Sequence, residues 1–335
     1  MVNVTTLSQP GFDGTTQDAL FLRLFGSEVL ASFEQATVMR DKHMVKQISE
    51  GKSVLFPAVG RASSSYHTEG EDLLSGSSYL TSVAHNEAVI KLDSLLTSSV
   101  FVPEIQSLKN HWGDRAEYSR QIGFALGTKF DEQVIKVLGL CAREAAKVSG
   151  ELGSLATTDK QVTAANMKTS GSDLFSAIFD AAEKMDEMSV PKDGRRWCIV
   201  TPAMYYNLLQ VAPSSTSSAA ATDVRVGGQA SITQGSDMPI PVAGINVVSS
   251  LNIDTASATV QESGTNTNYE ANDNSNVAGY VFHEGAVGTG QLKSMALTSD
   301  WIPQNLGYLI TGRLALGHGV LRPSSCIELN TVAFT

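Results

Sequence analysis

A segment of about forty residues, 46–86, is the feature of this sequence that most restricts how the chain folds. It is rich in serine and glycine, Pro57 interrupts it, and it holds few large apolar residues beyond Val54, Leu55, Phe56 and Val59. So little apolar surface cannot offset the entropy that a chain loses on ordering. A loop of this length is also uncommon inside a compact domain. We therefore expect the segment to be either disordered or ordered by a neighbouring chain.

Hydrophobic periodicity predicts regular elements on both sides of this segment. Apolar residues recur at helical spacing over 19–34, and residues 88–93 alternate as in a half-buried strand. The longest helical pattern covers 104–147 and would span about 65 Å as one helix. Several glycines weaken this helix, so we expect a kink or break near 123–127.

The pattern after residue 165 predicts a mixed α+β region. Residues 172–188 predict a helix with Ser172 as its N-cap and with an apolar face made of Phe175, Ile178, Phe179 and Ala182. Residues 195–209 predict a strand, a proline turn and a second helix. Further strands are expected over 245–253, 279–283, 289–297 and from Tyr308 to Gly317 or Gly319.

Two polar stretches, 213–236 and 254–278, predict surface loops within this region, because they hold almost no large apolar side chains.

The charge balance argues against a protein that grips nucleic acid. The net charge is −10 and the isoelectric point is about 5.1, so no basic surplus is present to bind phosphates. An acidic wall would repel DNA, which suits a container, but the same charge also serves simple solubility. Both readings stay open.

The use of cysteine suits a reducing cytoplasm. Cys141, Cys198 and Cys326 lie far apart and form no CxxC pair. We expect neither a secretory signal nor a membrane span, because no apolar run of the needed length occurs.

No catalytic, cofactor or metal motif emerges. Gly51-Lys52-Ser53 is not a phosphate-binding loop, because Lys46 stands where that motif requires glycine. The histidines are scattered, without the spacing of metal ligands. His283-Glu284 and His318 could flank a serine nucleophile, yet no G-x-S-x-G elbow exists. We therefore predict that the protein is not an enzyme.

Three stretches together carry a family resemblance. Residues 19–72 contain the run GKSVLFPAVGR (51–61), residues 283–297 read HEGAVGTGQLKSMAL, and residues 314–323 read LALGHGVLRP. In this order they resemble the major capsid protein of short-tailed phages of the T-seven-like kind. The resemblance frames the whole chain and is weak only over about 150–280.

The resemblance implies an α+β fold of the Hong Kong 97 phage type. This fold has an N-terminal arm, an extended β-hairpin loop, a peripheral domain with a long spine helix, and an axial domain. The expected boundaries are 1–45 for the arm, 46–87 for the loop, 88–164 for the peripheral domain, 165–288 for the axial domain, and 289–335 for strands that return to the peripheral domain.

The implied function is structural. Copies of the chain would assemble as hexamers and pentamers into an icosahedral virion capsid that encloses double-stranded DNA without reading its sequence. The implied partners are a scaffolding protein, a portal protein at one vertex and a decoration protein, with synthesis in the cytoplasm of a bacterial host. The alternatives are an encapsulin-like compartment, which shares the fold, and an unrelated α+β ligand-binding protein or enzyme.

The expected subunit interface lies on the arm and the extended loop. Phe56 stands out there, because the local sequence offers little to cover it, and Pro57 suits a strand edge. A small intramolecular cluster of Phe56 with Leu55 and Val59 is the alternative. Glu69, Glu71 and Asp72 either pair with Arg61 or Lys52 of a neighbour or form a solvated turn. The full set of expected interface residues is Phe25, Lys52, Phe56, Pro57, Arg61, Tyr66, Glu69 and Glu71.

Overall fold

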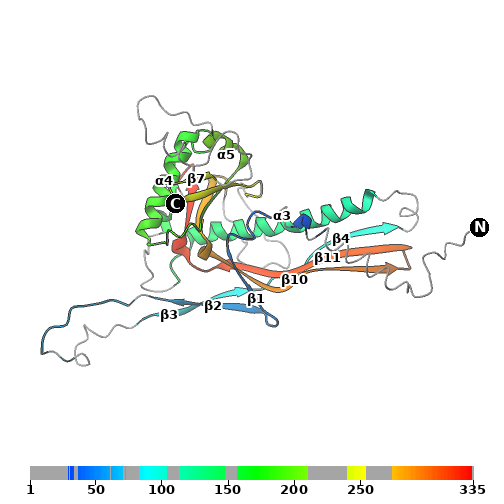
Figure 1. Ribbon diagram of the computed structural model, residues 1–335, viewed down its shortest axis with the longest axis horizontal. Helices are drawn as coiled ribbons and strands as arrows, with labels where there is room; N and C mark the ends of the chain where they lie inside the picture. Colours follow the sequence, from blue (N-terminus) through cyan, green and yellow to red (C-terminus); the bar gives the residue numbers. More distant parts are fainter. Residues whose placement is uncertain are drawn as a thin grey trace, which may run out of the picture.

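The computed structural model describes residues 29, 31–33, 37–60, 62–70, 72, 83–103, 113–147, 157–209, 240–253 and 274–333. In these ranges the chain forms two packed units and a hairpin that projects from them (Figure 1). Within the same ranges, no helix combines the length and the apolarity that crossing a membrane requires.

The first unit is a long four-stranded sheet. Its strands are, in order across the sheet, β1 (Met44–Gln47), β10 (Val287–Ile302), β11 (Gly307–Val320) and β4 (Leu96–Pro103). β10 and β11 form one long antiparallel hairpin, β4 pairs antiparallel with β11, and β1 runs parallel to β10. The strands predicted over 289–297 and from Tyr308 are thus confirmed, and β10 extends well beyond its predicted range.

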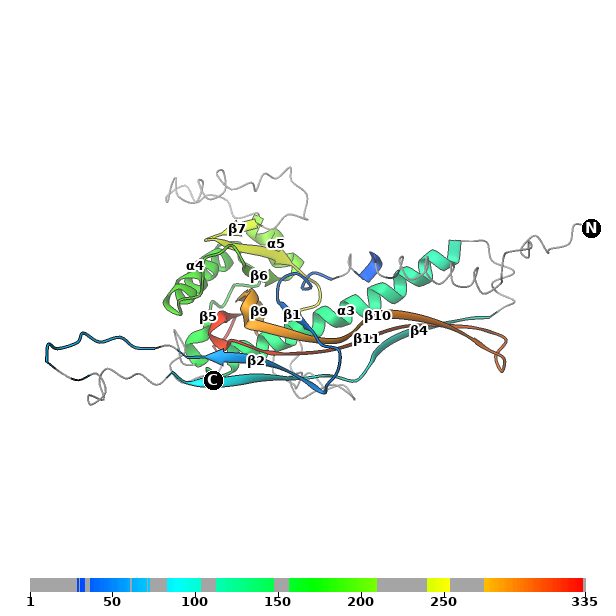
Figure 2. The same cartoon turned by 60° about the horizontal axis from the view of Figure 1, so that its bottom comes forward.

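One helix, α3 (Gly113–Arg143), lies along this sheet (Figure 2). Residues that recur at helical spacing bury its inner face in a common core with the sheet: Ile122, Leu126, Phe130, Val134, Val137 and Cys141. The predicted helix over 104–147 is confirmed from residue 113 and ends at Arg143; residues 104–112 lie outside the described ranges.

The break expected near 123–127 is wrong, because α3 continues as an α-helix through these residues. Gly123 serves close packing instead. A Cβ atom on Gly123 would lie 2.5 Å from the carbonyl oxygen of Val29 and 2.7 Å from the Cβ of Ser32. The missing side chain therefore allows the segment around residues 29–33 to cross the helix at close range.

The second unit is a six-stranded sheet with two helices. Its strands are, in order, β5 (Gln161–Thr163), β12 (Cys326–Asn330), β9 (Val277–His283), β6 (Arg196–Val200), β8 (Ile245–Ser249) and β7 (Ile240–Val242). The helices α4 (Gly171–Glu187) and α5 (Pro202–Leu209) pack their apolar faces into its core. The strand, proline turn and helix predicted over 195–209 are confirmed.

Helix α4 is confirmed in extent, but two details of its prediction are wrong. Its N-cap is Ser170, whose hydroxyl accepts a hydrogen bond from the Asp173 N–H, so the cap is two residues earlier than Ser172. Phe179 is exposed and Phe175 only partly buried, with their rings 4.9 Å apart. Ile178 and Ala182 of the predicted face are buried as expected, and the rest of the buried face is Leu174, Ala177, Ala181 and Met185.

Two short crossings join the units. β9 passes into β10 through the 3-10 turn η4 (Glu284–Ala286), and β11 passes into β12 through η5 (Pro323–Ser325). The crossings are bonded to each other, because the Leu321 N–H donates to the Ala286 carbonyl at 2.9 Å. The late strands thus serve both sheets: β10 and β11 belong to the first, whereas β12 belongs to the second.

A buried ion pair fastens the end of α3 to β12. The Arg143 guanidinium donates two hydrogen bonds to the Glu328 carboxylate, from Nη2 at 2.5 Å and from Nε at 2.9 Å. Their side chains are 9% and 2% exposed. At such burial each charge depends on the other, since water cannot replace a lost partner.

Glu328→Gln should therefore lower the free energy of unfolding of the unassembled subunit by about 3–5 kcal/mol, because it leaves the Arg143 charge buried without its counter-ion. Urea denaturation measures this. The matched control is Glu132→Gln, which removes a partly exposed partner of Lys129 and should cost less than about 1 kcal/mol. Equal losses in the two variants would contradict the proposed importance of the buried pair.

Candidate subunit interface

The segment that dominates the sequence forms half of a hairpin. β2 (Ser53–Val59) pairs antiparallel with β3 (His85–Lys91), in register from Ser53 opposite Lys91 to Val59 opposite His85. Both views show the hairpin projecting away from the first unit, opposite to the far ends of β10, β11 and β4 (Figures 1 and 2). The return strand runs to Lys91, beyond the expected end of the loop at residue 87.

The base of the hairpin rests on the first sheet. Gly290 of β10 and Gly317 of β11 are partners in the sheet register, and we call this pair the glycine seat. Val54 lies against Gly290, and the backbone at Lys91 lies against Gly317. The seat buries Val54 and leaves it 2% exposed. The expectation that only a neighbour could order this segment is thus wrong for β2, which has β3 and the sheet of its own chain.

The two faces of the hairpin differ sharply in exposure. The face with Val54 also carries Ile90 and Ala88, which are 1% and 4% exposed. The opposite face carries three apolar side chains that the chain leaves in solvent: Leu55 at 48%, Val89 at 53% and Val59 at 59%. Leu55 and Val89 are direct cross-strand partners and form an apolar pair, and Val59 lies on the same face beyond the pair of Pro57 and Glu87. We call these three residues the outer row.

Phe56 lies on the covered face, opposite Ala88. Its ring is partly buried, and the ammonium of Lys46 lies 5.3 Å from the ring centroid while donating to the Leu55 carbonyl at 3.1 Å. Leu55 and Val59 point to the other face, so the intramolecular cluster considered for these three residues does not form. Phe56 therefore supports the base of the hairpin within its own subunit.

The other expected interface residues lie along the hairpin and the segment beyond it. Lys52, Pro57 and Glu69 are exposed, and Tyr66 is fully exposed. Phe25, Arg61 and Glu71 lie outside the described residues. The pairing of Lys52 or Arg61 with acidic residues of a neighbour therefore stays a prediction. The structure adds the outer row, which the sequence analysis did not single out as a surface.

A short segment, 37–43, which we call the strap, leads from the arm into β1. Asp131 of α3 holds its start by accepting hydrogen bonds from the N–H groups of Val38 at 2.8 Å and Met39 at 3.2 Å. Farther along, the Lys42 ammonium lies 4.9 Å from the ring centroid of Trp197 in β6. The strap therefore contacts both units before the chain reaches the hairpin.

A buried chain of hydrogen bonds holds the end of the strap. His43 contacts the Met39 carbonyl through Nδ1 at 2.6 Å and the Thr289 hydroxyl through Nε2 at 2.7 Å, and that hydroxyl contacts Nδ1 of His318 at 2.7 Å. A carbonyl only accepts, so His43 carries its proton on Nδ1 and accepts from the threonine at Nε2. The threonine oxygen must then accept from Nδ1–H of His318. Both rings are neutral in this arrangement.

Burial shifts the pKa values of this region in opposite directions. It lowers the pKa of His43 to about 4. Burial, together with His43, also holds the pKa of His318 well below its ordinary value. Burial raises the pKa of Asp131 to about 6, although two backbone donors and Lys42 favour the carboxylate.

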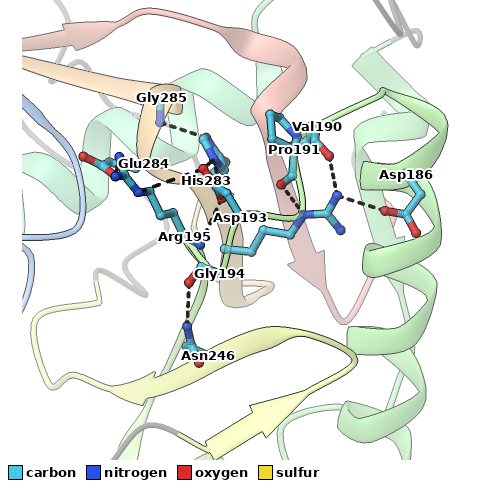
Figure 3. A network of polar contacts seen from close by, with 11 residues as sticks. Asp186, Val190, Pro191, Asp193, Gly194, Arg195, Asn246, His283, Glu284 and Gly285 are labelled. Atoms are coloured by element: carbon cyan, nitrogen blue, oxygen red, sulfur yellow. Dashed lines mark hydrogen bonds and ion pairs between the residues drawn. The ribbon is translucent and has the colours of Figure 1, made fainter.

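A second polar network surrounds the first crossing (Figure 3). Asp193 accepts from Nε2 of His283 at 3.2 Å, while Nδ1 of His283 accepts from the Gly285 N–H at 3.1 Å. Arg195 pairs with Glu284 at 3.0 Å. Both ring nitrogens of His283 are thus engaged, and His318 lies in the buried chain with Thr289. The serine triad considered from the sequence therefore does not assemble from these histidines.

Comparison with known proteins places this geometry in a family. A family model described as "Gp10A-like: Major capsid protein" matches residues 55–330. The chain belongs to this family. The major capsid protein of Escherichia phage T7 is 30% identical over 325 residues, which cover 92% of this chain and 90% of that protein. The major capsid protein of Enterobacteria phage T3 is 29% identical over 327 residues, with the same coverage of both chains.

Solved structures confirm the expected fold. The capsid of cyanophage P-SCSP1u matches with a TM-score of 0.73 and 32% identity over 89% of each chain. The mature capsid of bacteriophage PhiM1 matches with a TM-score of 0.65 over 89% of this chain and 88% of that one; at 15% identity it speaks for the fold alone. The α+β capsid fold and the major capsid family, both expected from the resemblance, are thus confirmed.

The strap predicts how the stability of this Gp10A-like protein depends on pH. Between pH 6.5 and 4, His43 and His318 take up protons in the unfolded chain but stay neutral in the folded chain. Lowering the pH over this range therefore lowers the free energy of unfolding. Between pH 6 and 3.8, Asp131 takes up its proton in the folded chain but not yet in the unfolded chain. Lowering the pH over this range therefore raises the free energy of unfolding. The two effects oppose each other in the wild type.

Asp131→Asn should remove the opposing effect of Asp131, so that the pH dependence caused by the histidines becomes measurable. As pH falls from 7 to 4, the variant should lose on the order of 2–3 kcal/mol more than the wild type does. Urea unfolding at a series of pH values measures the slope, which is independent of any constant cost of the substitution. Asp180→Asn, which removes the same charge from an exposed position on α4, is the control. Parallel pH curves for the wild type and Asp131→Asn would contradict this assignment.

Proposed function

We propose that this chain is the subunit that builds the head of a tailed phage. Copies assemble as hexamers and pentamers into an icosahedral capsid, which encloses double-stranded DNA without sequence-specific binding. The observation that carries this proposal is the projecting hairpin, whose outer row of Leu55, Val59 and Val89 is left uncovered by its own subunit. Membership of the major capsid protein family supports it.

In this proposal the two units take the roles expected from the resemblance. The first sheet with α3 is the peripheral domain, and α3 is its spine helix. The second sheet with α4 and α5 is the axial domain, which β5 and β12 join although the expected boundaries place them at 88–164 and 289–335. The arm over 1–45 and the loop over 46–87 reach neighbouring subunits.

The proposed interface uses the outer row and the exposed residues of the same region. Leu55 and Val89 supply the apolar centre, because charged side chains are depleted at the core of such contacts. Phe56 acts indirectly, by supporting the base of the hairpin. The remaining expected residues make up the rim: Phe25, Lys52, Pro57, Arg61, Tyr66, Glu69 and Glu71.

The partners other than the chain itself follow from assembly. A scaffolding protein would template the shell, a portal protein would replace one capsomer at a vertex, and a decoration protein would bind the finished surface. The chain would be made in the host cytoplasm and end in the virion capsid. Its net charge of −10 suits a wall that contains DNA without gripping it.

An encapsulin-like compartment is the second candidate, because it shares the fold. A virus-like particle from Pyrococcus furiosus matches over 92% of this chain and 99% of that chain, with a TM-score of 0.56. Its identity is 12%, so the match speaks for the fold alone. Family membership at 30% identity to a phage protein favours the phage head.

The outer row yields a test of assembly. Leu55→Ser combined with Val89→Ser should leave the melting temperature of the free subunit nearly unchanged, because both side chains are already half exposed. Losing an interface contact of about 2 kcal/mol should raise the concentration needed for assembly about thirtyfold. Analytical ultracentrifugation and electron microscopy, with a scaffolding partner present, measure shell yield.

The matched control is Val332→Ser, an exposed apolar residue outside the hairpin, which should assemble like the wild type. Phe56→Ala should lower subunit stability and assembly together, because its ring is partly buried within its own chain. Unchanged shell yield in the double variant would remove the outer row from the interface. A wild-type chain that stays monomeric with the scaffolding partner would contradict the proposed function itself.

A further inference from the structure

The glycine seat does more than bury Val54, because neither of its two positions has room for a Cβ atom. A Cβ atom on Gly290 would lie 2.4 Å from Cγ2 of Val54. A Cβ atom on Gly317 would lie 2.3 Å from the carbonyl oxygen of Lys91 and 2.8 Å from the Cα atom of Leu92. Each strand of the hairpin therefore touches the sheet at a position where only glycine fits.

Hydrogen bonds also fix the chain on either side of the hairpin to the sheet. The Ile48 N–H, directly after β1, donates to the Gln291 carbonyl of β10 at 3.0 Å, five residues before β2 begins. The Asp93 N–H donates to the Leu316 carbonyl at 3.0 Å, just after it leaves β3. The chain is thus bonded to β10 before it enters the hairpin and to β11 after it leaves, and the contacts at Gly290 and Gly317 lie between these two points.

We propose that Gly290 and Gly317 are positioning residues of assembly, because the seat they form sets the direction in which the hairpin leaves the subunit. This inference rests on the proposed function. In a closed shell the direction of the hairpin sets the angle at which one subunit meets the next. The seat therefore determines shell curvature through a contact inside each subunit.

Relieving this contact turns the hairpin. Relieving the 2.4 Å contact to an ordinary 3.4 Å requires a shift of about 1 Å away from the sheet. Applied to one of two strands about 4.8 Å apart, this shift turns the hairpin by about 10° about its own length. Leu55 and Val89 of the outer row turn with it, so the face offered to a neighbour changes its angle. Protein interfaces packed as closely as protein interiors do not absorb such a rotation.

The three stretches behind the family resemblance meet at this seat. Val54 comes from the run over 51–61, Gly290 from 283–297, and Gly317 from 314–323. Gly290 belongs to the glycine-rich run 285–290, and β2 passes it closely at Val54. These three stretches, to which the sequence analysis assigned no catalytic role, therefore have a structural role at the seat.

The decisive variants are Gly290→Ala and its combination with Val54→Ala. We expect Gly290→Ala to yield at least tenfold fewer shells of wild-type diameter, with open sheets or shells of altered size in their place. Removing the two Val54 methyl groups makes room for the added Cβ, so V54A/G290A should recover wild-type diameter. Electron microscopy measures diameter, and a melting curve of the free subunit tests folding.

Gly312→Ala is the matched control on β11. Its Cβ would lie 3.1 Å from Ile122 and 3.2 Å from Leu126, in the core under α3 and away from the hairpin. It should lower the melting temperature, yet the shells that form should keep the wild-type diameter. Altered diameter in G312A equal to that in G290A would overturn the positioning role, because core packing alone would then explain both.

A measurement on the free subunit tests the direction itself. Spin labels on V59C and D300C report the distance between the hairpin and β10, since the three native cysteines are buried. That distance should shift in G290A and return in V54A/G290A. An unshifted distance, or wild-type shells at wild-type yield from G290A, would overturn the inference. The wild-type chain, assembled in parallel, separates the two proposals. If the wild type forms no shells, the proposed function is wrong; if it forms shells and G290A behaves like it, the positioning role is wrong.

Discussion

The burial of one face of α3 against the long sheet is the interaction on which the rest of the structure depends. Ile122 and Leu126 lie over Gly312 of β11, and the same core includes Leu314 and Leu316. This seam makes the sheet rigid, since its strands pack against a continuous helix rather than against separate loops. A rigid sheet is what allows a hairpin set on its surface to have a definite direction.

The first sheet and the second unit behave as connected parts, because two crossings and the strap join them. The strap contacts α3 through Asp131 and β6 through Lys42 over Trp197. In the buried chain of hydrogen bonds at its end, through Thr289, both His43 and His318 are neutral. The attachment of the strap therefore depends on the protonation of a few buried groups. As the pH falls, the histidines lower the free energy of unfolding and Asp131 raises it.

The hairpin shows how a chain can keep apolar surface for a neighbour and remain well folded alone. Its covered face is buried on the seat, which gives β2 and β3 order that an isolated two-stranded hairpin lacks. Its outer row stays in solvent, where a monomeric protein would have no reason to keep three large aliphatic side chains together. Order within the subunit lowers the entropy lost on assembly, so more of the contact energy is available for holding subunits together.

Local sequence patterns determined much of this protein. Helical spacing located α4 and most of α3, alternation located β11, and the poverty of large apolar residues over 46–86 marked the segment that projects. Residues 51–61, 283–297 and 314–323 carried the resemblance that led to the correct fold and family. The strands β5, β7 and β12 escaped notice because three to five residues are too few to carry a period that separates a strand from a loop. β1 and β4 were missed as well, since neither has a buried residue.

Tertiary structure decided which residues meet. Gly123 weakened a predicted helix, and only the crossing segment at Val29 and Ser32 shows why the helix tolerates it. Phe56 looked uncovered because the residue that shields it, Lys46, reaches it across a turn. The outer row is defined by the register that sets Leu55 opposite Val89, thirty-four positions away in the chain (89 − 55). Sequence periodicity reports which way a side chain points within its own element, whereas partners distant in sequence are set by how the elements pack, and that is where the interface of this protein is made.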